Sequence, residues 1–301
     1  MRALDALLAG LVDYAGLFPP ASETMVQALQ SYASYLSGPD REALGRLIVP
    51  LSRLSEFERA AADLLPHENG ATPWKLSIIA SDASRAVDEI TAFNRRHADG
   101  SAVIDVVELK ASAPSEIERQ RAVLPDSFTP YFELPLDGDI PAMFETLARV
   151  GARAKIRTGG VTADAFPPAD AIIDFITASY RKGVPFKATA GLHHPVRGVY
   201  RLTYERESAS GTMYGFLNVF LAASLIATNG RREDARALLE ETEPSAFSFS
   251  DDAIVWRGHR FEAEQIRASR REFAISFGSC SFREPVDELE NLSRSTGVGA
   301  R

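Results

Sequence analysis

The chain has 301 residues, of which 45% are hydrophobic and 25% charged, and its formal net charge is −8. This is ordinary globular composition, and the acidic balance without a basic stripe argues against nucleic acid as a partner. No run approaches the roughly 18 apolar residues that a membrane helix needs, so we expect no membrane partner either.

Short runs rich in β-branched residues alternate along the chain with amphipathic stretches of helical spacing. The first 16 residues are interrupted by Asp5 and lack a basic leader, which predicts a helix and not a signal peptide. The runs with strand character are 11–17, 46–51, 74–80, 102–111, 129–136, 153–158, 185–191 and 273–279. Because helical stretches separate these runs, we expect parallel strands joined by crossover helices.

Eight such strand–helix units predict an α/β fold, a (β/α)8 TIM barrel formed as a single domain by residues 1–301. The largest irregularity lies between the seventh and eighth runs. An apolar helix, a charged helical stretch and a hairpin turning at 250–252 follow one another there, which predicts an insertion at residues 230–270. An open doubly wound sheet is the alternative, but no Gly-rich turn of the type G-x-G-x-x-G follows the first run.

Ionisable residues recur on one face of four consecutive predicted strands. Side chains alternate between the two faces of a strand, so the polar positions of these runs share the face opposite the apolar ones. The residues predicted to point into the barrel are Glu108, Lys110, Glu133, Lys155, Arg157, Lys187 and Thr189. Since barrel enzymes have their active sites at the C-terminal ends of the strands, we expect a pocket there. A salt-bridge network that fills the barrel is the alternative.

The predicted mouth of the barrel is more basic than the rest of the chain. Its lysines and its arginine suit a small carboxylate or phosphate compound. Backbone N–H groups in the turns at 157–160 and 277–281 would add donors for the anion, unless these glycines serve turn formation alone. The predicted substrate-binding residues are Lys110, Arg157, Gly159, Gly160, Thr189, His193, His194, Cys280 and Arg283.

Two of the lysines predicted to point inward, Lys155 and Lys187, lie near the ends of adjacent strands, within "KIRTGG" and "FKATAG". This arrangement resembles that of the class I deoxyribose-phosphate aldolases, which are (β/α)8 barrels. The resemblance implies that Lys155 forms a Schiff base with a carbonyl substrate, with Lys187 as the cationic neighbour that favours the neutral amine. It covers two short stretches, and the chain departs from the family at Arg157, at the glutamates of runs four and five, and in the long insertion.

The residues themselves support a lysine nucleophile. Such a lysine must be neutral, and burial and a neighbouring cation both favour that form. Lys155 meets this condition, and Lys187 is nearly as good a candidate. Glu108 or Glu133 is the expected general acid or base. The sequence therefore predicts a lyase of the aldolase type, which acts on a small anionic oxo acid or sugar phosphate and needs no cofactor.

A metal site is the competing interpretation. His193 and His194 follow the seventh run, and one of them would join Glu108 and Glu133 as ligands of a divalent metal in a lyase, isomerase or hydrolase. Neither H-x-H nor H-E-x-x-H spacing is present, which favours a hydrogen-bonding histidine. A third class is a barrel that binds a small ligand without any chemistry.

Three further positions flank the predicted mouth. Cys280 ends the eighth run as the chain's one cysteine, so we expect no internal disulfide, a cytoplasmic location, and a role in lining the pocket. Arg283 follows it, either facing the mouth or beginning a helix. Asp13 and Tyr14 either line the mouth or belong to a loop made rigid by the prolines that follow. The oligomeric state stays open, a homo-oligomer included.

Overall fold

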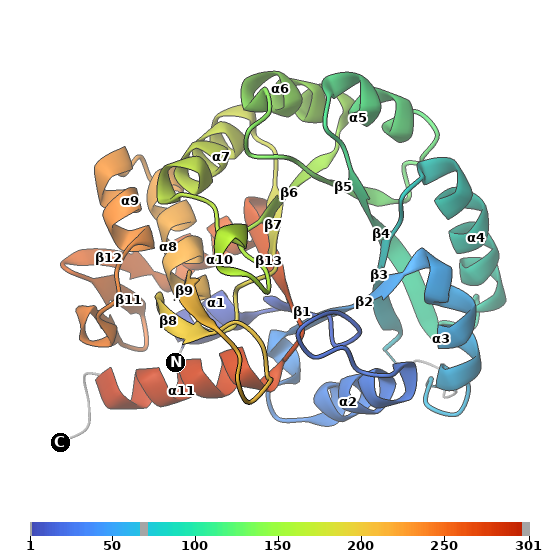
Figure 1. Ribbon diagram of the computed structural model, residues 1–301, viewed down its shortest axis with the longest axis horizontal. Helices are drawn as coiled ribbons and strands as arrows, with labels where there is room; N and C mark the ends of the chain where they lie inside the picture. The colour runs from blue at the N-terminus through green and yellow to red at the C-terminus, as the bar shows by residue number, and fades with distance from the viewer. Residues whose placement is uncertain (1, 67–71, 297–301) are drawn as a thin grey trace.

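The computed structural model describes residues 2–66 and 72–296. At its centre eight parallel strands form a closed barrel in the order β1-β13-β7-β6-β5-β4-β3-β2 (Figure 1). These strands are β1 (Val12–Tyr14), β2 (Leu44–Pro50), β3 (Trp74–Ile79), β4 (Ala102–Lys110), β5 (Thr129–Glu133), β6 (Arg153–Arg157), β7 (Phe186–Thr189) and β13 (Ala274–Ser279). The predicted (β/α)8 barrel is confirmed, and each predicted run overlaps one barrel strand.

Helices cover the outside of the barrel, and α2 to α7 form an arc around the strands in Figure 1. Their apolar stripes face inward: in α4, for example, Ala86, Ile90 and Phe93 are buried while Arg85 is exposed. These helices are α2 (Met25–Ser37), α3 (Leu54–Ala61), α4 (Ala83–Arg96), α5 (Pro114–Arg121), α6 (Ile140–Val150) and α7 (Ala169–Lys182). The N-terminal helix is α1 (Arg2–Leu8), and short 3-10 turns are η1 (Arg41–Ala43), η2 (Leu51–Arg53), η3 (Ala163–Ala165) and η4 (Pro244–Ala246).

The segment between β7 and β13 contains more than one crossover helix. Its elements are a hairpin of β8 (Gly198–Arg201) and β9 (Ser210–Met213), the helices α8 (Phe216–Ala227) and α9 (Arg232–Leu239), an antiparallel sheet of β10 (Phe247–Phe249), β11 (Ala253–Trp256) and β12 (His259–Glu262), and α10 (Ala263–Glu272). The chain then forms β13 and α11 (Arg283–Thr296). Residues 250–252 join β10 to β11, as the sequence predicts, whereas the β8–β9 hairpin is a feature that it did not predict.

The apolar core lies between the barrel and its helices. Phe144 of α6, Phe175 of α7 and Phe186 of β7 make successive edge contacts, with ring centroids 5.0 and 5.8 Å apart. Since the apolar residues of the strands pack outward, their polar residues are left to fill the barrel interior. Within the described residues, no helix is both long and apolar enough to cross a bilayer.

The chain leaves β7 through a left-handed turn at Ala190 (φ 61°) and Gly191 (φ 74°). A Cβ atom on Gly191 would lie 2.8 Å from the Cα atom of Gly159. We expect Gly191→Ala to lower the free energy of unfolding by about 2–3 kcal/mol, because backbone strain and a clash add together. Gly183 also has a positive φ, 63°, but a Cβ atom there would have nothing within 4 Å. Gly183→Ala should therefore lower the free energy of unfolding by only about 1 kcal/mol. Urea unfolding measures both, and equal costs would contradict the packing argument.

Candidate active site

A series of buried ion pairs crosses the barrel interior. Lys187 Nζ lies 2.6 Å from Asp13 Oδ2 and 2.6 Å from Glu108 Oε1. The other oxygen of Glu108, Oε2, lies 2.8 Å from Lys155 Nζ, and Lys155 Nζ lies 2.9 Å from Glu133 Oε2. Asp13, Glu108, Lys155 and Lys187 are each exposed by 3% or less. We call Asp13, Lys187, Glu108, Lys155 and Glu133 the interior network.

The strand register explains why these side chains meet. In the parallel pairing of β5, β6 and β7, Glu133 lies opposite Lys155, and Lys155 lies opposite Lys187. All three side chains point into the barrel because each alternates with an outward apolar neighbour, Phe132, Ile156 or Phe186 in turn. Glu108 reaches the same region from β4, and Asp13 from β1 on the far side of the closed barrel. The four consecutive strands therefore bring Glu108, Glu133, Lys155 and Lys187 together, but as the salt-bridge network that was the alternative to charges lining an open mouth.

Hydrogen bonds reach three of the four carboxylate oxygens of Asp13 and Glu108; among the described residues, the fourth, Glu108 Oε2, has its ion pair with Lys155 and no hydrogen-bond partner. The hydroxyl of Ser77 donates to Glu108 Oε1 at 2.6 Å. The hydroxyl of Ser276 donates to Asp13 Oδ2 at 2.7 Å, and the backbone N–H of Arg46 donates to Asp13 Oδ1 at 2.8 Å. Such bonds offset the cost of burying charge.

The network fixes the charge of Glu108 and of Lys187. Burial alone would raise the pKa of Glu108, but Lys155 and Lys187 outweigh it and hold that pKa below its usual range. Burial alone would lower the pKa of Lys187, but the carboxylates of Asp13 and Glu108 outweigh it and raise that pKa above its usual range. Lys187 is therefore held as an ammonium ion, which makes it a poor nucleophile.

These shifts predict how stability depends on pH. Because its folded pKa is lowered, Glu108 contributes stability that is present above its ordinary pKa of 4.5 and is lost as the pH falls towards the folded value. Lys187 contributes stability that is present below 10.5 and is lost as the pH rises through its raised folded pKa. Glu108→Gln should therefore flatten the acid limb of a plot of unfolding free energy against pH. An unchanged slope below pH 4.5 would contradict this assignment.

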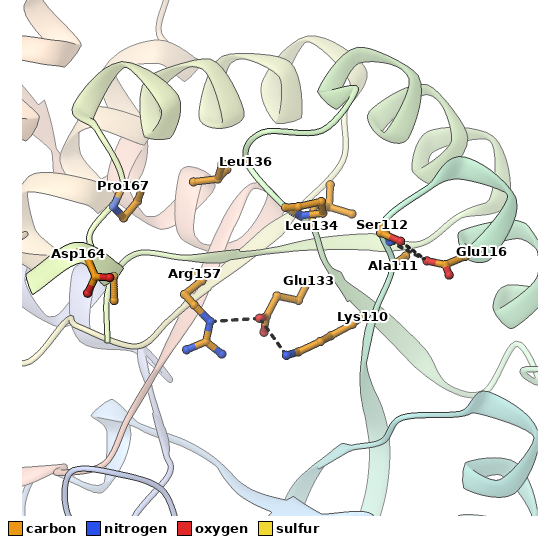
Figure 2. Close-up of a pocket in the computed structure, with 12 residues that line it drawn as sticks. Lys110, Ala111, Ser112, Glu116, Glu133, Leu134, Leu136, Arg157, Asp164 and Pro167 are labelled. Atoms are coloured by element: carbon orange, nitrogen blue, oxygen red, sulfur yellow. Dashed lines mark hydrogen bonds and ion pairs between the residues drawn. The ribbon is translucent and has the colours of Figure 1, made fainter. Parts of the chain in front are cut away.

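A pocket of about 580 Å³ opens at the C-terminal ends of β4, β5 and β6 (Figure 2). Lys110, Glu133 and Arg157 line it, and Glu133 Oε1 lies 3.2 Å from Arg157 Nε and 4.0 Å from Lys110 Nζ. Burial alone would raise the pKa of Glu133, but Lys155 and Arg157 outweigh it and lower that pKa. Since its second oxygen holds Lys155, Glu133 connects the pocket to the interior network.

Lys187 borders a different cavity, of about 340 Å³. This cavity is also lined by Asp13 and Tyr131, and by Thr129 and Arg153, which begin β5 and β6. It therefore lies towards the N-terminal ends of the strands, opposite the pocket at Glu133. Lys187 is the second residue of the short strand β7, so it lies deeper in the barrel than the alternation of the sequence alone indicates.

Several predicted binding residues do not line the pocket at Glu133. The backbone carbonyl of Thr189 accepts a hydrogen bond from the N–H of Thr158 at 3.0 Å. Gly159 and Gly160 form the turn after β6, where Gly159 packs against Gly191. These residues shape the turns at the barrel mouth through their backbone.

Cys280 and Arg283 also have structural partners. Cys280 is buried, with its Sγ 3.7 Å from the hydroxyl oxygen of Tyr204, and burial raises its thiol pKa to about 11. Such a thiol stays protonated and unreactive near neutral pH. Arg283 forms ion pairs with Asp40 and Asp287.

The two histidines contact α11. His193 Nδ1 lies 3.0 Å from Glu284 Oε2, and His194 Nδ1 lies 2.9 Å from Glu288 Oε2. Glu108 and Glu133 instead hold lysines, so the structure does not bring the four predicted metal ligands together; the described residues group His194 with Glu284 and Glu288.

Of the pair near the N-terminus, Asp13 belongs to the interior network, whereas the Tyr14 hydroxyl donates to Glu23 Oε2 at 2.5 Å. The supporting hydroxyls of Ser77 and Ser276 were not among the predicted site residues. Both are polar residues at inward positions of apolar runs, so strict alternation identifies them. Glu288 was not predicted either, and its only signal is its spacing of four residues from Glu284 on a helix.

The closed barrel of eight parallel strands places the chain in the (β/α)8 class of folds. No family model, no curated protein and no solved structure matches the chain. Because this fold hosts many unrelated chemistries, its function has to be argued from the site.

Proposed function

We propose that this protein is a carbon–carbon lyase of the aldolase type, which forms an imine between Lys155 and a small anionic carbonyl compound. The position of Lys155 carries the proposal: its Nζ lies 2.8 Å from Glu108 Oε2 and 2.9 Å from Glu133 Oε2, and Glu133 lines the pocket. An amine between two carboxylates has a proton acceptor in place for the transfers that imine formation requires.

Lys155 is a better nucleophile than Lys187. Each lysine pairs with one oxygen of Glu108 and with a second carboxylate, but Lys187 pairs with the buried Asp13, and its pKa is raised. Lys155 shares its second carboxylate, Glu133, with the pocket. When Lys155 passes its proton to Glu133, the ion pair that holds the two side chains together disappears. The same transfer therefore frees the amine and lets Glu133 move aside for the substrate.

The reaction then follows from these groups. The neutral amine of Lys155 attacks the carbonyl carbon, and the carbonyl oxygen takes up protons and leaves as water. The resulting iminium accepts the electron pair of the bond between the α and β carbons as that bond breaks. A carboxylate takes the proton of the β-hydroxyl group, and the β carbon leaves as the first carbonyl fragment. Protonation of the enamine at carbon and hydrolysis of the imine release the second carbonyl fragment and regenerate Lys155.

The two glutamates have different roles in this scheme. Glu133 lines the pocket, so it is the general acid and base that exchanges protons with the substrate. Glu108 is 1% exposed and accepts bonds from Lys155, Lys187 and Ser77, so it anchors the network.

Two exposed cations of the pocket would hold an anionic substrate. Lys110 and Arg157 have exposed side chains, with relative exposures of 78% and 49%, and share the carboxylate Glu133 between them. Glu116 and Asp164 are further lining carboxylates, so the support comes from these two cations and not from the net charge of the pocket; Glu116 is occupied by the backbone N–H of Ser112 at 2.7 Å. A carboxylate or phosphate group would bind to the two exposed cations.

We expect small hydroxy-oxo acids or phosphorylated hydroxyketones to raise the melting temperature, because they bind the folded state alone. Arg157→Gln should weaken this binding about 10-fold or more, since a charge-assisted hydrogen bond is lost. The matched control is Arg85→Gln, on α4, whose partner is Glu89. Equal shifts in both variants, or equal shifts with neutral analogues, would contradict the assignment.

Trapping with borohydride tests the proposed reaction. The protein is incubated with a panel of small oxo acids and hydroxyketone phosphates, reduced, and examined by intact mass spectrometry. We expect one adduct per chain and catalysed cleavage of the same compound. Binding without adduct or turnover would instead favour a non-catalytic ligand-binding barrel. Turnover that requires a divalent metal and leaves no adduct would favour a metal-assisted lyase, isomerase or hydrolase.

A further inference from the structure

A second polar cluster lies at the C-terminal end of the barrel, between the segment after β7 and the beginning of α11. His194 Nδ1 lies 3.0 and 2.9 Å from the two carboxylate oxygens of Glu288. Glu284 precedes Glu288 by one helical turn, and one ligand atom from each of the three residues lies within 4.8 Å of the others. Among residues 2–66 and 72–296, these three form the one such group of His, Cys, Asp and Glu side chains.

We propose that His194, Glu284 and Glu288 bind a divalent metal ion of the zinc class. An imidazole nitrogen with carboxylate oxygens is a ligand set that Zn²⁺ and Co²⁺ use, whereas Ca²⁺ and Mg²⁺ prefer oxygen ligands alone. Three protein ligands leave a further position for water or another small molecule.

The three side chains are held in place by the fold. Glu284 and Glu288 are four residues apart on α11, so they project from the same face of the helix. The His194 ring is stacked on Tyr200, with centroids 3.5 Å apart and planes at 14°, and the residue is only 9% exposed. The histidines follow the left-handed turn at Gly191, and both contact this helix. The ligands are therefore arranged before any ion binds.

Two further residues orient one of the ligands. Glu284 Oε2 accepts a hydrogen bond from the Tyr204 hydroxyl at 3.0 Å, and His193 Nδ1 lies 3.0 Å from the same oxygen. This leaves Glu284 Oε1 for the ion, in the manner of outer groups that fix metal-binding carboxylates. The adjacent histidines therefore have different roles: His194 is a ligand, and His193 positions Glu284.

This inference is independent of the proposed lyase function. The cluster shares no residue with the interior network, and its histidines pair with α11 and not with Glu108 or Glu133. Lys155→Met should therefore leave metal binding unchanged, so that one proposal can fail while the other stands.

Metal titration of the chain of 301 residues tests the inference. The protein is stripped with a chelator and titrated with Zn²⁺ by calorimetry and with Co²⁺ by visible absorption. We expect one ion per chain, a Co²⁺ spectrum that Zn²⁺ displaces, and a higher melting temperature. His194→Gln and Glu288→Gln should each weaken binding by more than about 100-fold, and His193→Gln by about 10- to 100-fold. Glu290→Gln, on the same helix and paired with Arg294, should bind as the wild type does.

Circular dichroism and thermal melting establish that each variant folds. Should His194→Gln or Glu288→Gln fail to fold, Glu284→Gln and the wild-type titration decide the question. Absence of stoichiometric binding by the wild type would overturn the inference. So would a folded ligand variant that binds Zn²⁺ as tightly as Glu290→Gln.

Discussion

Lys155→Arg should abolish cleavage of any compound that borohydride reduction traps as an adduct on the wild-type protein. The expected loss in kcat is about 10³-fold or more, because a guanidinium cannot become the neutral amine that attacks a carbonyl. Arginine keeps the positive charge between Glu108 and Glu133, so the loss would reflect chemistry and not a broken ion pair. Steady-state kinetics on the trapped compound measure the effect.

Lys110→Met provides the matched control for this experiment. Lys110 is also a partner of Glu133, but it lines the pocket, its side chain is 78% exposed, and its Nζ lies 4.0 Å from Glu133 Oε1. If it only binds the anion, its loss should raise KM while kcat stays within a few-fold of wild type. Retention of more than roughly a tenth of wild-type kcat by Lys155→Arg would contradict the role of Lys155.

Lys187→Met should be the most destabilising single substitution in the interior network. It removes the cation that lies 2.6 Å from both Asp13 and Glu108, and leaves two buried carboxylates with less countercharge. Loss of one partner from a buried ion pair costs about 3–5 kcal/mol. Chemical denaturation at neutral pH measures the change in the free energy of unfolding.

Two comparisons make this prediction specific. Lys182→Met breaks a pair with Glu145 in which both side chains are largely exposed, so it should cost at most about 1 kcal/mol. Adding Asp13→Asn to Lys187→Met should recover part of the loss, because one uncompensated charge is removed while a hydrogen-bond acceptor remains. Equal costs for the two lysine variants would show that the buried pairs contribute little.

The barrel itself could be predicted because its signal is local. A run such as 102–111 shows its β-branched residues directly, and each run is separated from the next by a stretch of helical spacing. The β8–β9 hairpin has no such signal: "GVYR" and "SGTM" are short, lie largely at the surface, and bury no regular face. Its position depends on tertiary contacts that a local pattern does not contain.

The direction of the charged side chains could also be predicted, but not their depth or partners. The alternation of apolar and polar residues along β6 and β7 predicts that Lys155 and Lys187 face the barrel interior, and both side chains are buried there. The stagger between neighbouring strands separates Lys187 from the pocket at Glu133. Closure of the barrel brings Asp13, from the first strand, into contact with Lys187. Both effects depend on register across the whole barrel, which one strand's sequence cannot specify.

The location of the reduced adduct tests the central claim most directly. After incubation with a carbonyl compound that raises the melting temperature, the protein is reduced with borohydride, digested and mapped by peptide mass spectrometry. We predict substrate-derived mass on the peptide that contains Lys155, and none on the peptides that contain Lys110 or Lys187. An adduct on either of those two lysines, or catalysed cleavage with no adduct on Lys155, would contradict the proposed imine.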